Sequence, residues 1–210
     1  MSYTPEDAAQ DRFFDELEKE LYPQHKEQAI EEFTNERFQS VYTKNPEIAK
    51  NAALFYREAK SLLDHGHPSA SFVFAVSAIE QLLKATLLKP VVYGLVHHDP
   101  LAELIVEFTF GQTGFDRYNK LLAKLFESLA GINLDTVQRQ GSAKKLLDEV
   151  SDLQKLRNRI IHQGLQTQDA EAKNALSITE AVFSQIVIEM LRALGLRFEK
   201  SGKIVPAARV

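Results

Sequence analysis

The sequence contains no cysteine, and it has only nine glycines and seven prolines in 210 residues. Without cysteine the chain has no disulfide bond, no thiolate nucleophile and no cysteine-based zinc site. So few glycines and prolines are not typical of a low-complexity chain or of an all-β chain with many turns. The composition, 44% hydrophobic and 26% charged, is that of a globular protein of about one domain. The lack of cysteine is compatible with the cytoplasmic location that we predict.

We expect neither a signal peptide nor a membrane anchor. The N-terminal segment is acidic, and it has neither the basic region nor the apolar region of a secretory signal. The most apolar run, residues 72–88, carries Glu80 and Lys84 near its middle, and a charged side chain at the centre of a bilayer is costly. The run therefore predicts a buried helix of a soluble protein.

Acidic residues are concentrated at the N-terminus. Residues 1–36 contain eleven Asp or Glu against three Lys or Arg, whereas the whole chain has 29 acidic and 25 basic residues. The rest of the chain is therefore mildly basic. We interpret the acidic segment as a solvated helix, and an acidic segment that shields a phosphate-binding site is the alternative.

Apolar residues recur at helical spacing along the chain, which predicts an all-α fold without strand pairs. The expected organisation is an acidic N-terminal helical extension over residues 1–45, a helical bundle over 46–198 and a flexible C-terminal tail over 199–210. Within the bundle we expect helices over residues 46–64, 69–89, 101–109, 115–130, 142–163 and 169–195.

The helix over residues 142–163 interrupts its own apolar pattern. Arg157 falls in the middle of the apolar arc, between Leu153 and Ile160. Arginine keeps its proton, and burying it without a partner would cost several kcal/mol. Arg157 must therefore meet a carboxylate, lie at a subunit interface or line a pocket for an anion.

Two further polar residues follow Arg157 on the same helix. Asn158 and His162 are four residues apart and share one flank of the helix. His162 is in the last turn, where the negative end of the helix dipole favours an imidazolium ion. Gly164 predicts the end of the helix.

The segment Arg157–His162 matches the R-N-x-x-x-H form of the R-x(4–6)-H signature of HEPN domains. The helix that contains Ala75–Ala85, with Glu80 at its centre, is similar to the second helix of those domains. The order of the helices agrees as well, because the motif lies near the end of a later helix that one more helix follows. The chain therefore resembles a HEPN domain over about residues 46–198.

The resemblance implies a compact helical bundle that forms a homodimer through its motif helices. Many HEPN proteins are metal-independent endoribonucleases in toxin–antitoxin, phage-defence or RNA-processing systems. Others are non-catalytic modules that bind a nucleotide or a protein partner, and we keep this alternative. In a subset, a nucleotidyltransferase antitoxin modifies a tyrosine two residues after the motif histidine, and Gly164 occupies that position here.

The resemblance makes Arg157 and His162 the predicted catalytic residues. RNA is cleaved when its 2′-OH attacks the adjacent phosphorus, a reaction that needs a base, an acid and positive charge against the phosphorane. Histidine suits acid–base catalysis near neutral pH, and the arginine fork matches phosphate. A two-fold interface would bring two copies of each residue into one cleft. We expect Asn158 to orient the site or hold phosphate, and Glu80 to pair with Arg157 or hold the motif helix.

We predict no metal and no cofactor. His65 and His67 lie in one turn, and His97, His98 and Asp99 in another, and neither group has the i, i+4 spacing of ligands on a helix. The sequence has no glycine-rich phosphate-binding loop and no nucleophile elbow of a serine hydrolase. The predicted partners are RNA or a nucleotide, a second copy of the chain, and an antitoxin or regulatory protein.

Overall fold

The computed structural model describes residues 12–13, 16, 36–96, 99–110, 123–124, 127 and 131–207. The chain divides into two compact units, Met1–Glu36 and Arg37–Val210, and the fold below is that of the second unit. Most of the predicted N-terminal extension, most of the helix predicted over residues 115–130, and the pair His97 and His98 lie outside the described residues.

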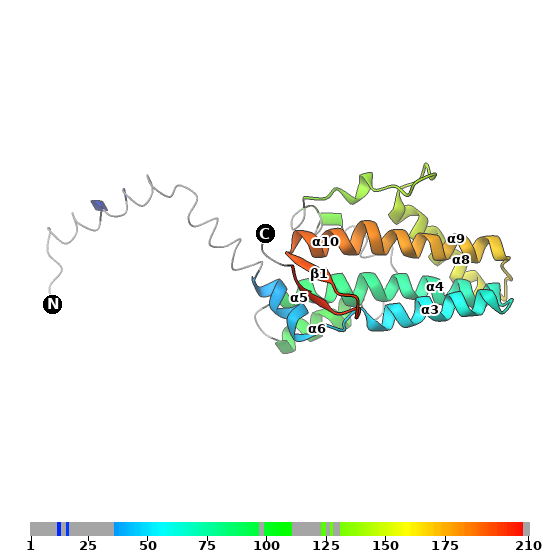
Figure 1. Cartoon of the computed structure of the whole chain (residues 1–210), viewed down its shortest axis with the longest axis horizontal. Helices are drawn as coiled ribbons and strands as arrows, with labels where there is room; N and C mark the ends of the chain where they lie inside the picture. The colour runs from blue at the N-terminus through cyan, green and yellow to red at the C-terminus, as the bar shows by residue number, and fades with distance from the viewer. Residues whose placement is uncertain are drawn as a thin grey trace. The chain divides into compact units, whose positions relative to one another are not determined.

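The second unit is a bundle of helices that run beside one another, with a two-stranded hairpin at one end (Figure 1). This architecture confirms the predicted all-α class. The helices are α3 (Lys50–Asp64), α4 (Pro68–Gln81), the π-helical η1 (Leu82–Leu88), α5 (Lys89–Leu95), α6 (Asp99–Phe110), the short 3-10 helix η2 (Leu134–Thr136), α8 (Leu146–Gln163), α9 (Asp169–Val182), the π-helical η3 (Phe183–Val187) and α10 (Ile188–Ala193).

Helix α4 is the centre of the bundle, because it packs against α3, α8 and α9. Phe72, Val76 and Ile79 on this helix are fully buried, and burial of each such side chain contributes about 1.5–3 kcal/mol. Among the described residues, the stretch Pro68–Gly94 is the one helical stretch long and apolar enough to cross a membrane. Of its most apolar part, 61% is buried inside the protein, as expected of a core helix.

The central helix does not end before Pro90, as the sequence predicts, but continues through α5 to Leu95. A proline inside a helix has no N–H to donate to the carbonyl four residues earlier, which here is that of Thr86. The hydroxyl of Tyr42 donates a hydrogen bond to that carbonyl over 2.6 Å. Tyr42 is fully buried, and burial raises the pKa of its hydroxyl far above the ordinary value, so the group stays a donor. Tyr42 thus supplies the donor that Pro90 lacks.

Tyr42 belongs to a helical segment, residues 36–44, that packs into the bundle. Phe38 in this segment is fully buried, and it lies so close to Gly94 that a β-carbon on Gly94 would overlap its ring. The side chain of Arg37 donates a hydrogen bond to the Gly94 carbonyl over 3.0 Å. Residues 37–44, which the sequence assigns to the extension, thus contact the bundle, and the compact unit begins at Arg37.

The predicted absence of strand pairs is wrong, because a short hairpin includes part of the segment that the sequence assigns to the C-terminal tail. Strand β1 (Leu196–Phe198) pairs antiparallel with β2 (Ile204–Pro206). Ile204 is only 1% exposed, and its N–H donates to the carbonyl of Pro46 over 2.9 Å. The buried side chain and this backbone bond fix the hairpin to the start of the bundle. Residues 208–210 lie outside the described residues.

Helix α8, which carries the motif, ends at the predicted glycine and starts four residues later than predicted. Gly164 has a left-handed backbone (φ 67°) and closes the helix through its N–H, which donates to the Arg159 carbonyl. Before the helix, the N–H of Leu146 donates to the carbonyl of Val137 over 2.9 Å, and Lys145 has an extended backbone. The segment before α8 is thus held against an earlier part of the chain instead of being helical.

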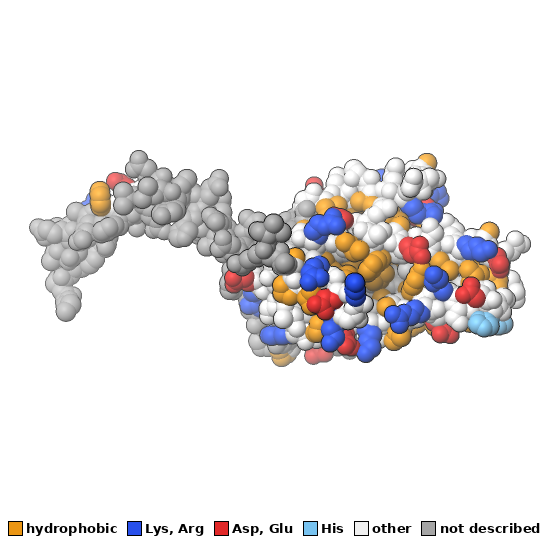
Figure 2. All heavy atoms as spheres, viewed as in Figure 1, with side chains coloured by type: hydrophobic (Ala, Val, Ile, Leu, Met, Phe, Trp, Pro, Cys, Tyr) orange, Lys and Arg blue, Asp and Glu red, His pale blue; other side chains and the backbone are white. Residues whose placement is uncertain are grey.

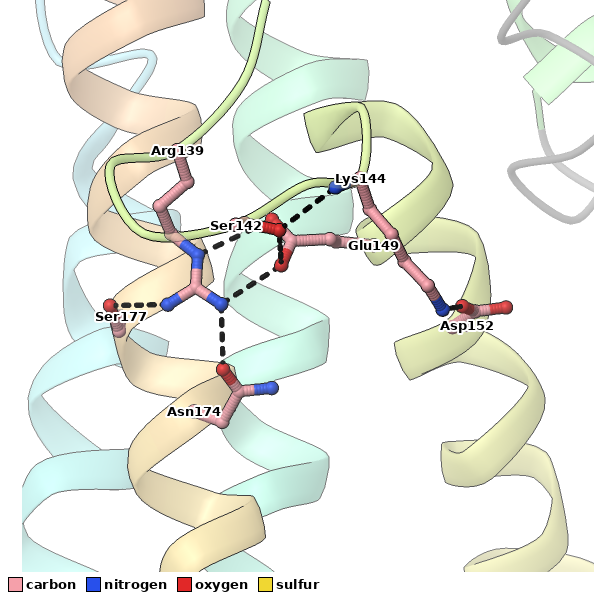
Figure 3. A network of polar contacts seen from close by, with 7 residues as sticks. All are labelled: Arg139, Ser142, Lys144, Glu149, Asp152, Asn174 and Ser177. Atoms are coloured by element: carbon pink, nitrogen blue, oxygen red, sulfur yellow. Dashed lines mark hydrogen bonds and ion pairs between the residues drawn. The ribbon is translucent and has the colours of Figure 1, made fainter.

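A buried ion pair anchors the first turn of α8 (Figure 3). The guanidinium of Arg139 donates to both carboxylate oxygens of Glu149, over 2.9 and 3.3 Å. It also donates to Ser177 over 3.1 Å and to Asn174 over 2.8 Å, both on α9. Glu149 is 8% exposed and accepts a further bond from Ser142 over 3.0 Å. The network joins the segment before α8 to both α8 and α9.

Replacing Tyr42 with Phe should lower the free energy of unfolding by about 1–3 kcal/mol, because the buried Thr86 carbonyl loses its donor. The cost should be smaller when Pro90 is also replaced with Ala, because residue 90 then has an N–H of its own. Urea unfolding of the wild type, both single variants and the double variant measures this coupling. An equal cost in both backgrounds would contradict the assigned role of Tyr42.

Replacing Arg139 with Met should lower the free energy of unfolding by about 3–5 kcal/mol, because it leaves the Glu149 carboxylate buried without its cation. The control is Lys144→Met, which removes an exposed ion pair to Asp152 beside the same network. This control should leave the urea midpoint unchanged, since water screens an exposed pair. Similar midpoints for the two variants would show that the Arg139 network does not anchor α8.

Candidate functional site

The four residues predicted for the site lie on two helices that pack against each other. Glu80 is in the last turn of α4, and Arg157, Asn158 and His162 are in the C-terminal half of α8. Helix α8 is held in place from both ends, by the Arg139 network at its start and by the segment after Gly164 at its end. In that segment, the N–H of Thr167 donates to the hydroxyl of Ser69 on α4 over 2.9 Å.

Arg157 faces the carboxylate of Glu80, one of the three environments that the sequence allows for it. The distance from Nη1 of Arg157 to Oε1 of Glu80 is 3.9 Å, and the two side chains are 28% and 21% exposed. The same Oε1 atom accepts a hydrogen bond from the side-chain amide of Gln154 over 2.7 Å. Gln154 therefore holds the carboxylate, while Arg157 lies beside it in a loose ion pair.

The sequence analysis did not identify Gln154 as a site residue. It is 7% exposed, and it lies three residues before Arg157 on the packing side of α8. Residues three apart on a helix are neighbours, so a second polar residue on the packing side was the available signal.

The guanidinium of Arg157 uses few of its five donors. Its Nε atom is buried and has no hydrogen-bond partner among the described residues, and its Nη1 atom reaches Oδ1 of Asn158 only over 3.5 Å. Arg139, in contrast, donates to Glu149, Ser177 and Asn174. A partly buried guanidinium with unused donors can receive an anion, because carboxylates and phosphates match its fork.

His162 does not join the cluster formed by Glu80, Gln154 and Arg157. It is exposed in the last turn of α8, and no hydrogen bond or ion pair links it to another described residue. Five residues separate it from Arg157, so at about 100° per residue the two side chains leave the helix about 140° apart. Within one chain, Arg157 and His162 therefore lie on different sides of the same helix end.

The exposed side of this helix end contains Asn158, Ile161 and His162, and we refer to it as the open face of α8. Asn158 and His162 are four residues apart, and Ile161 lies beside them on the helix. Ile161 is 47% exposed, an unusual environment for a large apolar side chain at the end of a motif. An apolar side chain between two polar ones is suited to contact with another protein surface.

His65 and His67 lie in the turn between α3 and α4. The ring Nδ1 of His65 is 2.7 Å from the carbonyl of Ser61, in the last turn of α3. His67 precedes Pro68, the first residue of α4. Within the described ranges, no group of three or more His, Asp or Glu side chains is arranged to hold a metal ion.

No family model, no curated protein and no solved structure matches the chain. The resemblance to HEPN domains therefore stays a prediction from the motif and the order of the helices.

Replacing Arg157 with Met should change the free energy of unfolding by less than about 1 kcal/mol, or raise it, because the change removes a partly buried charge with an orphaned donor. The matched variant is Arg139→Met, for which we expect a large loss. Urea unfolding of the two variants compares them directly. A loss of several kcal/mol for Arg157→Met would assign this arginine to the stability of the bundle instead of to a ligand.

Proposed function

We propose that the protein is a metal-independent endoribonuclease of the HEPN type that acts as a homodimer. The observation that carries the proposal is the small number of hydrogen bonds that the guanidinium of Arg157 makes. Arg157 is 28% exposed and lies 3.9 Å from Glu80 on α4, and its Nη1 atom reaches Asn158 only over 3.5 Å. An RNA phosphate would match the nitrogens of this guanidinium that are not buried.

In the proposed reaction, the 2′-OH of RNA attacks the adjacent phosphorus. The P–O bond to the next nucleotide breaks, leaving a 2′,3′-cyclic phosphate and a 5′-OH. Arg157 stabilises the negative charge on the phosphorane, and Asn158, next to it on α8, holds a phosphate oxygen. Glu80 positions the guanidinium, and Gln154 holds Glu80. The reaction needs a proton acceptor and a proton donor, and both roles suit imidazole.

A second copy of the chain completes this site in the proposal. Within one chain His162 points away from Arg157, and a single imidazole cannot serve as acid and base at once. A two-fold axis beside the C-terminal half of α8 would bring two copies of Arg157 and two copies of His162 into one cleft. The exposed Ile161 would then be covered.

A non-catalytic module that binds a nucleotide or a protein partner is the second candidate. It is favoured by the lack of any hydrogen bond that orients the ring of His162 among the described residues, because a catalytic histidine is usually oriented by a second group. In this case Arg157 would hold a phosphate without turnover, and the open face would bind an antitoxin or regulatory protein.

The test is cleavage of mixed single-stranded RNA and of total tRNA in EDTA, with the product ends identified by mass. The wild type should produce cyclic-phosphate ends. Arg157→Met should lower the rate by about 100-fold or more, and His162→Ala by a similar factor, because each removes one part of transition-state stabilisation.

Two matched controls belong to this experiment. Arg159→Met removes an exposed arginine from the same helix, and His65→Ala removes a histidine from another helix end. Both should cleave at the wild-type rate. Absence of cleavage by the wild type, together with saturable nucleotide binding that His162→Ala retains, would contradict the nuclease and support the binding module.

A further inference from the structure

The carboxylate of Glu80 meets two donors of α8 through the same oxygen atom. Its Oε1 accepts a hydrogen bond from the side-chain amide of Gln154 over 2.7 Å, and it lies 3.9 Å from Nη1 of Arg157. The first distance is that of a short hydrogen bond, and the second is too long for one. The neutral amide is thus bound more closely than the cation, although a guanidinium is the stronger partner for a carboxylate.

The same chain contains a close pair of the same two residue types. Both carboxylate oxygens of Glu149 accept hydrogen bonds from the guanidinium of Arg139, over 2.9 and 3.3 Å. In the pair of Glu80 and Arg157, no hydrogen bond joins the guanidinium to either oxygen. A bidentate pair needs both oxygens of the carboxylate, so the orientation of the Glu80 carboxylate decides how closely Arg157 is bound.

Gln154 is in a position to fix this orientation. It is 7% exposed and lies on α8 one turn before Arg157, and α8 packs against α4, which carries Glu80. A buried side chain is confined by its neighbours, because protein interiors are closely packed. The amide of Gln154 can therefore hold the Glu80 carboxylate in one orientation.

The protein has no excess of positive charge that would attract a phosphate by itself. Its formal net charge is −4. Figure 2 shows Lys and Arg side chains interspersed with Asp and Glu on the face that α3 and the hairpin present, so this face offers no continuous basic surface. The affinity for a phosphate chain should therefore depend on single cations that a carboxylate does not already bind closely.

We propose that Gln154 is a positioning residue that keeps Arg157 available to a phosphate group. By holding Oε1 of Glu80, its amide prevents the carboxylate from turning both oxygens toward the guanidinium. Arg157 then stays in a loose pair, and its nitrogens that are not buried bind the phosphate of the substrate. This inference rests on the proposed function, because it concerns how the same site binds RNA.

The experiment measures binding of a fluorescein-labelled single-stranded oligodeoxynucleotide to the full chain, by fluorescence anisotropy at low ionic strength. The probe has phosphates but no 2′-OH, so the proposed reaction cannot cleave it. Gln154→Met keeps the size of the side chain and removes the amide. It should weaken binding about tenfold, because the phosphate then competes with a close Glu80 pair for Arg157. Gln166→Met, which changes an exposed glutamine after α8, should bind like the wild type.

The readout specific to positioning is the same substitution in a Glu80→Gln background. That background has no carboxylate to bind Arg157 closely, so Gln154→Met should leave its affinity unchanged. A glutamine that only supported the packing of α8 would lower the affinity equally in both backgrounds. Circular dichroism checks that each variant is folded, and Gln154→Leu, with the same expectations, replaces the methionine variant if that one unfolds.

Equal affinities of the wild type and Gln154→Met, or an equal loss in both backgrounds, would overturn the positioning role. Absence of probe binding, or equal binding by Arg157→Met and the wild type, would overturn it as well, because Arg157 would then not be a phosphate ligand. The expected pattern of binding without RNA cleavage by the wild type would contradict the nuclease alone and support the role of Gln154.

Discussion

The apolar helix from Pro68 to Leu95 must be covered on every side, and most of the structure follows from that constraint. Its apolar side chains require α3, α8 and α9 as neighbours. Its proline has no N–H for the Thr86 carbonyl, and the Tyr42 hydroxyl donates to this carbonyl from a segment that the sequence assigns to a separate extension. Glu80 is the one carboxylate of this helix, and its charge needs polar partners from α8. The cluster of Gln154 and Arg157 around Glu80 is therefore a consequence of a charge on the core helix, as well as the candidate site.

Two arginines, Arg139 before α8 and Arg157 on it, differ in the number of contacts that they make with the fold. Arg139 has several hydrogen bonds to a carboxylate and to α9, and every one of them holds an element of the fold. Arg157 has a loose pair with Glu80 and a buried nitrogen that no group in the described part of the chain contacts by a hydrogen bond. A bundle that used Arg157 only for stability would do better with an apolar side chain of the same size. The unused donors are thus the physical argument for a ligand, and they are independent of the motif in which Arg157 lies.

The sequence predicts the parts of this fold that depend on neighbours along the chain. Helical periodicity predicts the helices of the core, and Gly164 predicts the end of α8, because both signals act within a few residues. The errors all involve distant partners. From the local sequence, Pro90 predicts the end of a helix. The Tyr42 hydroxyl, which donates to the Thr86 carbonyl, comes from 44 residues earlier in the chain, so the local sequence does not reveal it. The hairpin is too short to give a clear strand pattern. Its position depends on the burial of Ile204 against the start of the bundle, which the local sequence does not show. For the site, the helical arc predicts that Arg157 needs a partner, and a carboxylate is one of the three that it allows. That this carboxylate is Glu80, held by Gln154, depends on the packing of α8 against α4 and is not visible in the local pattern.

The arrangement of the helices separates the motif from the opposite side of the bundle. Helices α3 and α8 each pack against both α4 and α9, and they lie on opposite sides of the α4–α9 pair. A homodimer formed through the open face of α8, as proposed, would therefore leave α3 uncovered. The interface and the rest of the bundle surface can thus differ in composition, because only the face of α8 has to fit a second copy of the chain.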